Sequence, residues 1–422
     1  MLQTFKHCQG RMWKILTRKL KETNIDWIGE VPENWEISTI GSHYTERTDK
    51  VSDLDYIPLS VTKSGIVPQL EIAAKSSNHD NRKLVLKDDF VINSRSDRKM
   101  SAGISSIDGS VSVINTVLYS NTIDRNYTKY LLKNYAFAEE FYKWGTGIVD
   151  DLWSTKWLKM KNIPIPVPSS EKQKQIGSVI DSMVQNTNNI INGTKESILE
   201  LKKYRQSVIT EAVTKGLNPN VKMKESGIDW IGDIPKHWNI KKIKYSTSTF
   251  DAKKDFVKED IYIGLENVLS YEGRINDYGK LEKDSKEKYF EKGNILYSKL
   301  RPYLAKAFIA DITGSCSGEF IVFESFKGNK RYLLYWLISQ LFTDFINATS
   351  YGAKMPRSSW DYIKETSIPR PPKHEENEIV SYLDDKLSQI NKLIENKTKV
   401  IKELETYKNS LIYEYVTGKK EV

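Results

Sequence analysis

Two long stretches of this chain place mostly apolar side chains at alternating steps of three and four residues. One stretch covers residues 191–212 and the other covers residues 379–415. The positions are Ile191, Thr194, Ile198, Leu201, Arg205, Val208 and Ala212, and then Ile379, Leu383, Leu387, Ile390, Ile394, Lys397, Ile401, Leu404, Lys408, Leu411 and Tyr415. This is the spacing of a helix that packs along its length against another helix. A continuous helix over residues 171–215 would measure roughly 65 Å at about 1.5 Å per residue, more than a compact domain needs internally.

Each stretch follows a proline-rich lead-in and contains no proline itself. The lead-in residues are Pro164, Pro166 and Pro168 before the first stretch, and Pro369, Pro371 and Pro372 before the second. Proline is compatible with the residues that precede a helix but not with a helix interior. The pattern therefore predicts two long helices, each of which needs a long partner to cover its stripe.

We expect the two helices to pack against each other as an antiparallel coiled coil, because their stripes match. Two other arrangements fit the same pattern. Each helix could break into separate core helices, in the first case near Asn192-Gly193, or the helices could drive homodimerisation instead. Thr194 and Arg205 are polar stripe positions. They weaken internal packing and favour a partner surface.

The chain contains a tandem repeat. Residues 21–35 match residues 224–238 at an offset of 203 positions, with nine of fifteen residues identical, and residues 204–214 match residues 407–417 at the same offset. The duplicated segments run from about 21 to 216 and from 224 to 419. A repeat this long exceeds the roughly 20 to 50 residues of a solenoid unit, so we expect each copy to be a domain with its own core.

The copies diverge between their matching ends, over residues 44–145 and 247–350. Both middles mix short β-branched runs with turn residues and then show a helical pattern, which indicates an α+β unit. The predicted elements are strands at 90–92 and 110–114 and a helix over 127–144, and in the second copy strands at 295–297 and 320–323 and a helix over 330–347. Matching ends around different middle segments suggest one scaffold that presents two different recognition surfaces.

The composition of the chain indicates an anionic partner. The chain has 422 residues, of which 39% are hydrophobic and 11% aromatic, enough for two domains with substantial cores. Lys and Arg number 64 against 55 Asp and Glu, which leaves a net charge of +9. An anionic partner suits such a surface. A merely lysine-rich surface explains the same excess.

Cysteine usage and hydropathy bear on the compartment. Cys8 and Cys316 are too few for a disulfide framework and lack metal-ligand spacing, which indicates a reducing environment and no zinc site. Residues 1–20 contain no continuous apolar stretch and do not resemble a signal peptide. The most apolar stretch, 332–342, is shorter than the roughly 18 residues of a membrane helix and is expected to be a buried helix. These features favour a cytoplasmic protein.

Basic residues lie beside the predicted strands of both copies. They are Arg95, Arg98 and Lys99 in the first copy, and Lys299, Arg301 and Lys306 in the second, with Tyr303 among them. Two further cations, Lys354 and Arg357, follow Gly352 in the second copy. Arg and Lys on loops can neutralise phosphates, and Arg can also read guanine edges in the major groove. Gly147 and Gly352 lie at equivalent places, where a glycine loop could approach a nucleic-acid backbone closely. Solvated loop charges and ordinary turns are the alternative interpretations.

The sequence lacks the motifs of several enzyme classes. It has no Gly-rich loop that ends in Gly-Lys-Ser/Thr and no Gly-x-Ser-x-Gly elbow, and its five histidines show no metal-binding spacing. Of the carboxylates, Asp26 and Asp229 recur in both copies, within a Trp- and Pro-containing motif typical of packing and turns. We expect no catalytic residues, no metal site and no cofactor bound by this chain.

The repeated motifs resemble those of the specificity subunits of Type I restriction-modification systems. The resemblance rests on the opening Ile-Asp-Trp-Ile-Gly-x-x-Pro-x-x-Trp at 25–35 and 228–238, and on the segment 297–304. It also rests on the Ile-Pro-x-Pro lead-in to each helix and on the Val-Thr pair at 213–214 and 416–417. It extends over about residues 21–419, nearly the whole chain.

The resemblance implies two target recognition domains, each reading one half of a bipartite, asymmetric DNA target, spaced by the antiparallel helices in a pseudo-twofold arrangement. The implied divisions are an N-terminal extension (1–20), recognition domain 1 (21–168), helix 1 (169–216), a linker (217–223), recognition domain 2 (224–372) and helix 2 (373–419). The partners implied are double-stranded DNA, two modification (methyltransferase) subunits and restriction (translocase and nuclease) subunits. S-adenosylmethionine, ATP and Mg would serve those subunits, inside a bacterial or archaeal cell.

Two other classes of protein compete with this interpretation. A single-chain DNA-modifying or restricting enzyme would need an adenine-methyltransferase motif such as Asn/Asp-Pro-Pro-Tyr/Phe, which Asn218-Pro219-Asn220 does not match. A coiled-coil interaction protein without nucleic acid accounts for the helices but not for divergent centres inside matching frames.

Overall fold

The chain folds into two compact units in the computed structural model, which describes residues 19–69, 79–147, 153–352 and 354–422. Unit 1 comprises residues 1–193 and 400–422, and unit 2 comprises residues 194–399. These boundaries cut both long helices, so each unit contains parts of both sequence repeats. The prediction that each repeat has a core of its own is wrong for the main core of each unit, which contains residues of both repeats, whereas the smaller core of each unit lies within one repeat.

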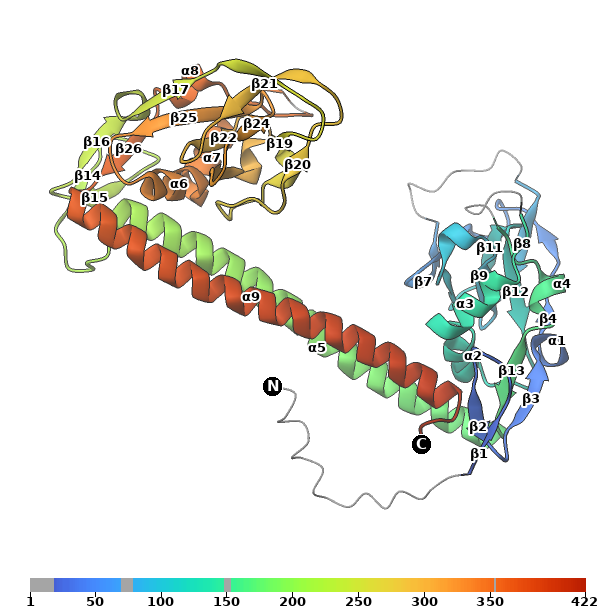
Figure 1. Ribbon diagram of the computed structural model, residues 1–422. Coiled ribbons are helices and arrows are strands. Elements are labelled where there is room, and N and C mark those ends of the chain that lie inside the picture. The colour runs from blue at the N-terminus through green and yellow to red at the C-terminus, as the bar shows by residue number, and fades with distance from the viewer. Residues whose placement is uncertain (1–18, 70–78, 148–152, 353) are drawn as a thin grey trace. The chain divides into compact units, whose positions relative to one another are not determined.

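The globular part of unit 1 is an α+β structure (Figure 1). Its elements are β1 (Leu20–Glu22), β2 (Glu30–Pro32), β3 (Glu36–Thr39), α1 (Ile40–His43), β4 (Thr45–Glu46), β5 (Lys50–Val51), β6 (Leu59–Thr62), β7 (Gly65–Pro68), β8 (Arg82–Val85), β9 (Phe90–Asn93), η1 (Ser96–Arg98), β10 (Ala102–Ile104), β11 (Gly109–Ser112), β12 (Asn115–Tyr119), α2 (Arg125–Leu131), α3 (Tyr135–Lys143), α4 (Trp157–Met160) and β13 (Pro164–Val167). The central sheet has the order β10-β9-β12-β4, and a second sheet has the order β11-β8-β5.

The globular part of unit 2 repeats this design. Its elements are β14 (Met223–Glu225), β15 (Asp233–Pro235), β16 (Asn239–Lys242), η3 (Ile243–Tyr245), β17 (Thr247–Phe250), β18 (Lys253–Phe256), β19 (Ile261–Ile263), η4 (Leu265–Asn267), β20 (Gly279–Lys280), β21 (Ser285–Phe290), β22 (Ile295–Ser298), η5 (Pro302–Leu304), β23 (Ala307–Ile309), β24 (Gly314–Cys316), β25 (Phe320–Phe326), α6 (Lys330–Ile338), α7 (Gln340–Ala348), α8 (Trp360–Ile363) and β26 (Ser367–Arg370). The central order β17-β25-β22-β23 matches β4-β12-β9-β10, and the second sheet is β18-β21-β24-β19-β20. In unit 1, β6 and β7 form a separate hairpin instead.

The apolar runs of the central strands are buried on both faces. In β9, Phe90 and Ile92 belong to the core that contacts the helices, whereas Val91 belongs to a second core shared with β8 and β11. In β22, Ile295 and Tyr297 lie on the helix side and Leu296 on the other. Side chains alternate between the faces of a strand, so a sheet with a core on each face requires continuous apolar residues.

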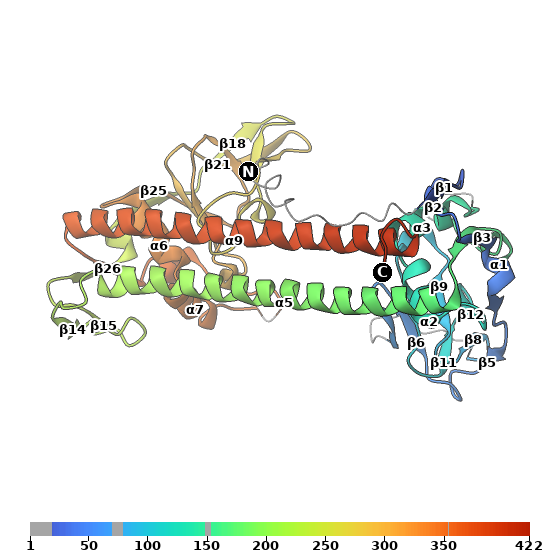
Figure 2. The same cartoon turned by 90° about the horizontal axis from the view of Figure 1, so that it is seen from below.

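Two long helices, α5 (Ser170–Lys215) and α9 (Lys373–Val416), complete the fold. Helix α5 continues through Asn192 and Gly193, which confirms the prediction of one continuous helix. Within each unit a stretch of α5 (green) lies beside a stretch of α9 (red) and runs in the opposite direction (Figures 1 and 2). Every predicted stripe position is buried or half-buried, as the three-four spacing requires.

Polar pairs join the two helices inside each unit. Lys408 Nζ lies 2.8 Å from Asn188 Oδ1 in unit 1, and Arg205 Nη1 lies 3.0 Å from Asn391 Oδ1 in unit 2. The Arg205 side chain is 5% exposed, lies 3.7 Å from the Glu272 carboxylate, and has its pKa lowered by burial. The prediction that Arg205 favours a partner surface is therefore wrong. Its guanidinium is accommodated internally because two polar partners surround it.

Two buried tyrosines bind the ends of the long helices. Tyr127 in α2 and Tyr332 in α6 are both fully buried and occupy equivalent positions. The carbonyl oxygens within reach of each hydroxyl are those of Pro166 (3.0 Å) and Val416 (2.9 Å) for Tyr127, and those of Pro369 and Val213 (3.1 Å each) for Tyr332. Each tyrosine thus contacts the lead-in of its own repeat and the helix end of the other repeat.

The two helical patterns of the variable centres each fold as two helices rather than one. Asn134 accepts a hydrogen bond from the Phe137 N–H and begins α3, and Ser339 accepts one from the Phe342 N–H and begins α7. Both side chains are N-caps, which compete with helix continuation. The stretch 332–342 is buried as predicted but is divided between α6 and α7. Among the described residues, no helix combines the length and apolarity that a bilayer crossing requires.

Candidate nucleic-acid interface

In both units, a loop that follows the central strand is held by a segment that precedes the last short helix. We call residues 94–100 and 299–306 the basic loops, and residues 153–155 and 356–358 the bracing segments. The backbone bonds run from the Ser96 N–H to the Trp153 carbonyl (2.8 Å), Thr155 to Ser94 (2.9 Å), Arg301 to Pro356 (2.7 Å) and Ser358 to Lys299 (2.9 Å). Equivalent residues make equivalent bonds, so two unlike sequences share one backbone frame.

The basic loop of unit 1 contains three of the predicted DNA-binding residues. Arg95 Nε donates to Asp97 Oδ1 at 3.0 Å, and Arg98 Nε lies 3.5 Å from the same carboxylate. Lys99 Nζ lies 3.0 Å from Glu139 of α3, with both side chains exposed. The structure therefore places these three cations on one loop, each beside an acidic side chain. Solvent screens the attraction within these surface pairs.

The basic loop of unit 2 contains four predicted residues, of which Arg301 and Tyr303 are exposed. Lys299 is half-buried. Lys306 points inward instead: its Nζ donates to the Leu265 carbonyl at 2.6 Å, and burial lowers the pKa of Lys306. The loop thus presents two cations and one aromatic ring, while the fourth predicted residue supports the loop from within.

The bracing segment brings the remaining predicted residues to the same place. Arg357 belongs to it, and Lys354 is exposed shortly before it. Arg357 Nη2 lies 2.6 Å from Glu319 Oε1, and Glu319 also accepts the Lys299 N–H at its backbone carbonyl (2.8 Å). Lys299, Arg301 and Arg357 therefore lie on one edge of unit 2, as a nucleic-acid contact requires.

A hollow of about 310 Å³ opens beside this edge. Lys299, Arg357, Lys288 and Asp251 contribute its charged groups, and Trp360 and Tyr351 add aromatic surface. The Lys288 ammonium, 2.8 Å from Asp251, lowers the pKa of that carboxyl. With three cations against one anion, the hollow suits an anionic or hydrogen-bond-accepting group such as a phosphate or a guanine edge.

Tyr271 is a supporting residue that the sequence did not indicate. Its backbone is in the left-handed region (φ +61°), its N–H donates to the Ala305 carbonyl at 3.3 Å and its hydroxyl to the Tyr303 carbonyl at 2.9 Å. These bonds hold the C-terminal part of the basic loop. Tyr271 lies about thirty residues upstream in a divergent region, so no local pattern could relate it to the loop.

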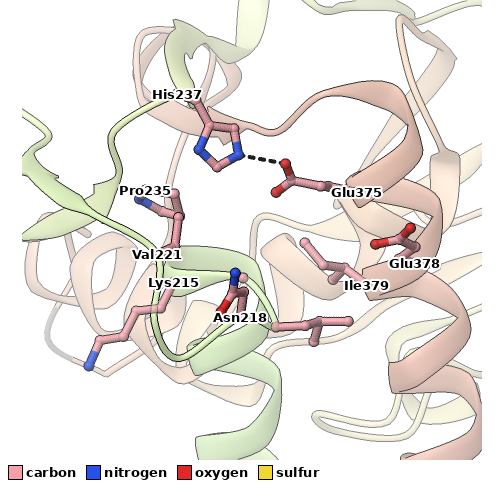
Figure 3. A pocket seen from close by; sticks show the side chains of 10 residues that line it. Lys215, Asn218, Val221, Pro235, His237, Glu375, Glu378 and Ile379 are labelled. Carbon is pink, nitrogen blue, oxygen red and sulfur yellow. Dashed lines mark hydrogen bonds and ion pairs between the residues drawn. The ribbon is translucent and has the colours of Figure 1, made fainter.

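A separate cavity of about 330 Å³ lies where α5 ends and α9 begins (Figure 3). The Glu375 carboxylate lies 2.5 Å from His237 Nε2 and accepts the Trp238 indole N–H at 2.8 Å. Glu375 is in the first turn of α9, where a carboxylate also complements the helix dipole. The contact fastens the opening motif of the second repeat to α9, which is a structural role.

Arg301 provides a test of the loop geometry. Its φ of +51° costs a non-glycine residue roughly 1–2 kcal/mol. We expect Arg301→Gly to be more stable than Arg301→Ala by about 1 kcal/mol, since both lack the guanidinium and differ in backbone freedom. Urea denaturation of both variants measures this difference. A more stable alanine variant would contradict the assigned conformation.

Comparison with known proteins agrees with this duplicated design. The family model described as the Type I restriction modification DNA specificity domain matches residues 32–200 and again residues 224–404. The EcoDI specificity subunit of Escherichia coli is 25% identical over 240 residues, which is 52% of this chain and 54% of that protein. The MjaVIII specificity subunit of Methanocaldococcus jannaschii is 26% identical over 277 residues, 61% of this chain and 62% of that protein. Both matches thus span less than two thirds of those relatives.

A solved structure shares the fold. That structure is described as the structural basis underlying complex assembly and conformational transition of the type I R-M system. It superposes with a TM-score of 0.66 at 13% identity, covering 92% of this chain and 98% of that one. Because the family model matches both repeats and most of the chain, this protein belongs to the type I restriction-modification specificity family and carries two copies of its DNA specificity domain.

Proposed function

We propose that this chain is the DNA-reading subunit of a type I restriction-modification complex and that each recognition domain reads one half of a bipartite, asymmetric target. The observation that carries the proposal is the shared frame of the basic loops. At equivalent backbone positions the first loop has Ser94 and Ser96, whereas the second has Lys299 and Arg301. One frame with different side chains is what two unlike half-sites require.

The side chains of the second loop suit direct readout of bases. Arg301 can bind the O6 and N7 atoms of guanine bidentately, while Lys299 and Lys354 suit phosphate oxygens. Tyr303, with 41% of its surface exposed, offers apolar contact beside them. In the first loop Arg98 is the most exposed cation and is assigned the corresponding role.

Two modification subunits are the proposed protein partners, and the exposed faces of the long helices support this assignment. Unit 1 exposes Ile190 and Tyr407, at 55% each, and unit 2 exposes Leu393 at 49% and Tyr204 at 47%. The offset of 203 relates Ile190 to Leu393 and Tyr204 to Tyr407. Each unit thus presents an equivalent pair of one aliphatic residue and one tyrosine, and two copies of one partner can bind two equivalent surfaces.

The chemistry of the complex is assigned to its other subunits. Methyl transfer from S-adenosylmethionine belongs to the modification subunits, and ATP- and Mg-dependent translocation and cleavage belong to the restriction subunits. This chain would select the site and hold those subunits, and the complex would act in the cytoplasm of a bacterial or archaeal cell. The absence of enzyme motifs from the sequence supports this division of labour.

Methylome sequencing of cells that express this chain with its modification subunit tests the proposal. We expect a split adenine-methylated motif that disappears when the chain is deleted. Arg301→Gly should change the preferred bases in one half of the motif and leave the other half intact, because each domain reads separately. A change in both halves, or a motif that persists without the chain, would refute the assignment.

Subunit counting tests the paired docking surfaces. Replacing Leu393 with Asp and Tyr204 with Ser should reduce the complex from two modification subunits to one, since a buried aspartate opposes docking at one surface only. Leu158→Asp, at a residue that is 69% exposed in α4, is the control and should retain both. Native mass spectrometry gives the stoichiometry. Loss of both subunits, or of neither, would exclude two independent surfaces.

A further inference from the structure

Unit 1 contains a second basic surface, apart from the predicted DNA-binding residues. A hollow of about 730 Å³ lies between the globular part and the two long helices. Its charged lining residues are Lys63, Lys87, Arg125, Lys129, Lys133 and Lys408, with Asp88 as the one acid in the lining. These six cations come from the β6-β7 turn, the β8-β9 turn, α2, the segment after α2, and α9 of the other repeat. We call this surface the helix-side hollow.

Most of this positive charge has no acidic partner among the residues that the structure describes. Arg125 pairs with Asp88, and Lys129 lies 2.7 Å from Asp181 of α5. The other four cations, Lys63, Lys87, Lys133 and Lys408, form no ion pair with any described residue. Charges of one sign along a concave wall focus the field outward into the hollow and attract anions.

The amines of Lys133 and Lys408 are held in place by neutral acceptors. Lys133 Nζ donates to the Lys63 carbonyl at 2.9 Å, and Lys408 Nζ donates to Asn188 Oδ1 at 2.8 Å. Burial, followed by the nearby charge of Lys129, lowers the pKa of Lys133 to about 8. A lysine whose charge is disfavoured in the free protein gains from an anion that approaches it.

The other unit provides an internal comparison. The equivalent hollow of unit 2, of about 820 Å³, is lined by Arg205 and Asn391, which correspond to Lys408 and Asn188. Its charged lining residues are Arg205, Arg274, Arg331 and Lys392 against Glu272, Asp384 and Glu395. Four cations against three acids leave little net charge. The excess in unit 1 is therefore a property of that unit and not a requirement of the shared fold.

We propose that the helix-side hollow of unit 1 binds the sugar-phosphate backbone of duplex DNA that lies on the first recognition domain. The inference rests on the proposed function and adds a sequence-independent contact to one half of the complex. Met100, Gly103 and Ile104 line the hollow, and Met100 directly follows Arg98 and Lys99 of the basic loop. DNA seated on that loop would reach the hollow without leaving the protein surface. Cations from several elements suit a polyanion better than a single small anion.

Salt dependence of DNA binding tests this assignment. Lys63 and Lys87 are exposed and form no ion pair with described residues, so a Lys63→Gln, Lys87→Gln variant should fold normally. Its matched control is Lys174→Gln, Lys236→Gln, which removes two exposed lysines outside the hollow. The affinity of the full chain is measured from 50 to 300 mM salt for two fluorescent duplexes of the same length. One duplex contains the motif found by methylome sequencing, and the other lacks it.

We expect the hollow variant to lower the slope of log affinity against log salt by about 2, since each phosphate contact contributes roughly 0.9. Affinity at 0.15 M salt should fall about ten- to thirtyfold for both duplexes, with the preference for the motif unchanged. The control should differ little from the unmodified chain.

Three results would overturn the inference. The hollow variant could match the control in slope and affinity, or lose affinity for the motif duplex alone, which would mean base readout. The unmodified chain could also fail to bind DNA, which would remove the proposed function as well. Binding without preference for the motif would contradict the proposed function only, because the slopes would still decide whether the hollow binds phosphates.

Discussion

Each globular part of this protein is closed by helices from both sequence repeats, and the rest of the structure depends on that shared closure. The Tyr127 hydroxyl reaches a carbonyl 289 positions away at the end of α9, and the Tyr332 hydroxyl reaches one 119 positions away near the end of α5. Both hydroxyls are buried, and a helix end that moved away would remove one of the two carbonyl acceptors that lie within reach of each hydroxyl. Apolar residues of both helices surround them in each core.

This closure distinguishes the residues that the two units share from the side chains that differ between them. The opening motif, the lead-in, the buried tyrosine and the helix ends occupy equivalent positions in both units, because each core needs the same pieces. The pairs Lys408–Asn188 and Arg205–Asn391 lie within the helix contact, where a polar residue fixes register at some cost in stability. The basic loops follow the central strands β9 and β22 and are held by backbone bonds. Their side chains, and those of the helix-side hollow, can differ between units without disturbing the core.

Sequence patterns predicted the parts of this fold that follow a period. The three-four stripe gave both long helices, and the continuous apolar runs gave β9, β22 and β25, because burial on both faces needs such runs. Helix breaks were missed at Asn134 and Ser339, where one capping side chain outweighs the helical pattern around it. Arg205 was assigned to a partner surface because its two polar partners, Asn391 and Glu272, are remote in sequence.

For the same reason, the sequence indicated only part of the spatial grouping of the candidate DNA-binding residues. Basic residues near the strands were visible in the sequence, and the structure places most of them on two equivalent loops. The bracing segments, Tyr271 and the helix-side hollow depend on contacts between distant segments, which no local spacing encodes. Lys306 looked like its neighbours in sequence, yet its amine is bonded to the Leu265 carbonyl.

Each structural unit combines both repeats, and the unfolding of two fragments tests this arrangement most directly. Fragment 194–399 is one continuous segment that contains all of unit 2. Fragment 224–419 is the second sequence repeat, and it lacks Val208, Ile209, Ala212 and the Val213 carbonyl that Tyr332 binds. Urea denaturation of both as monomers should show cooperative unfolding for 194–399 alone. A monomeric 224–419 that unfolds as cooperatively and at the same urea concentration would contradict the account.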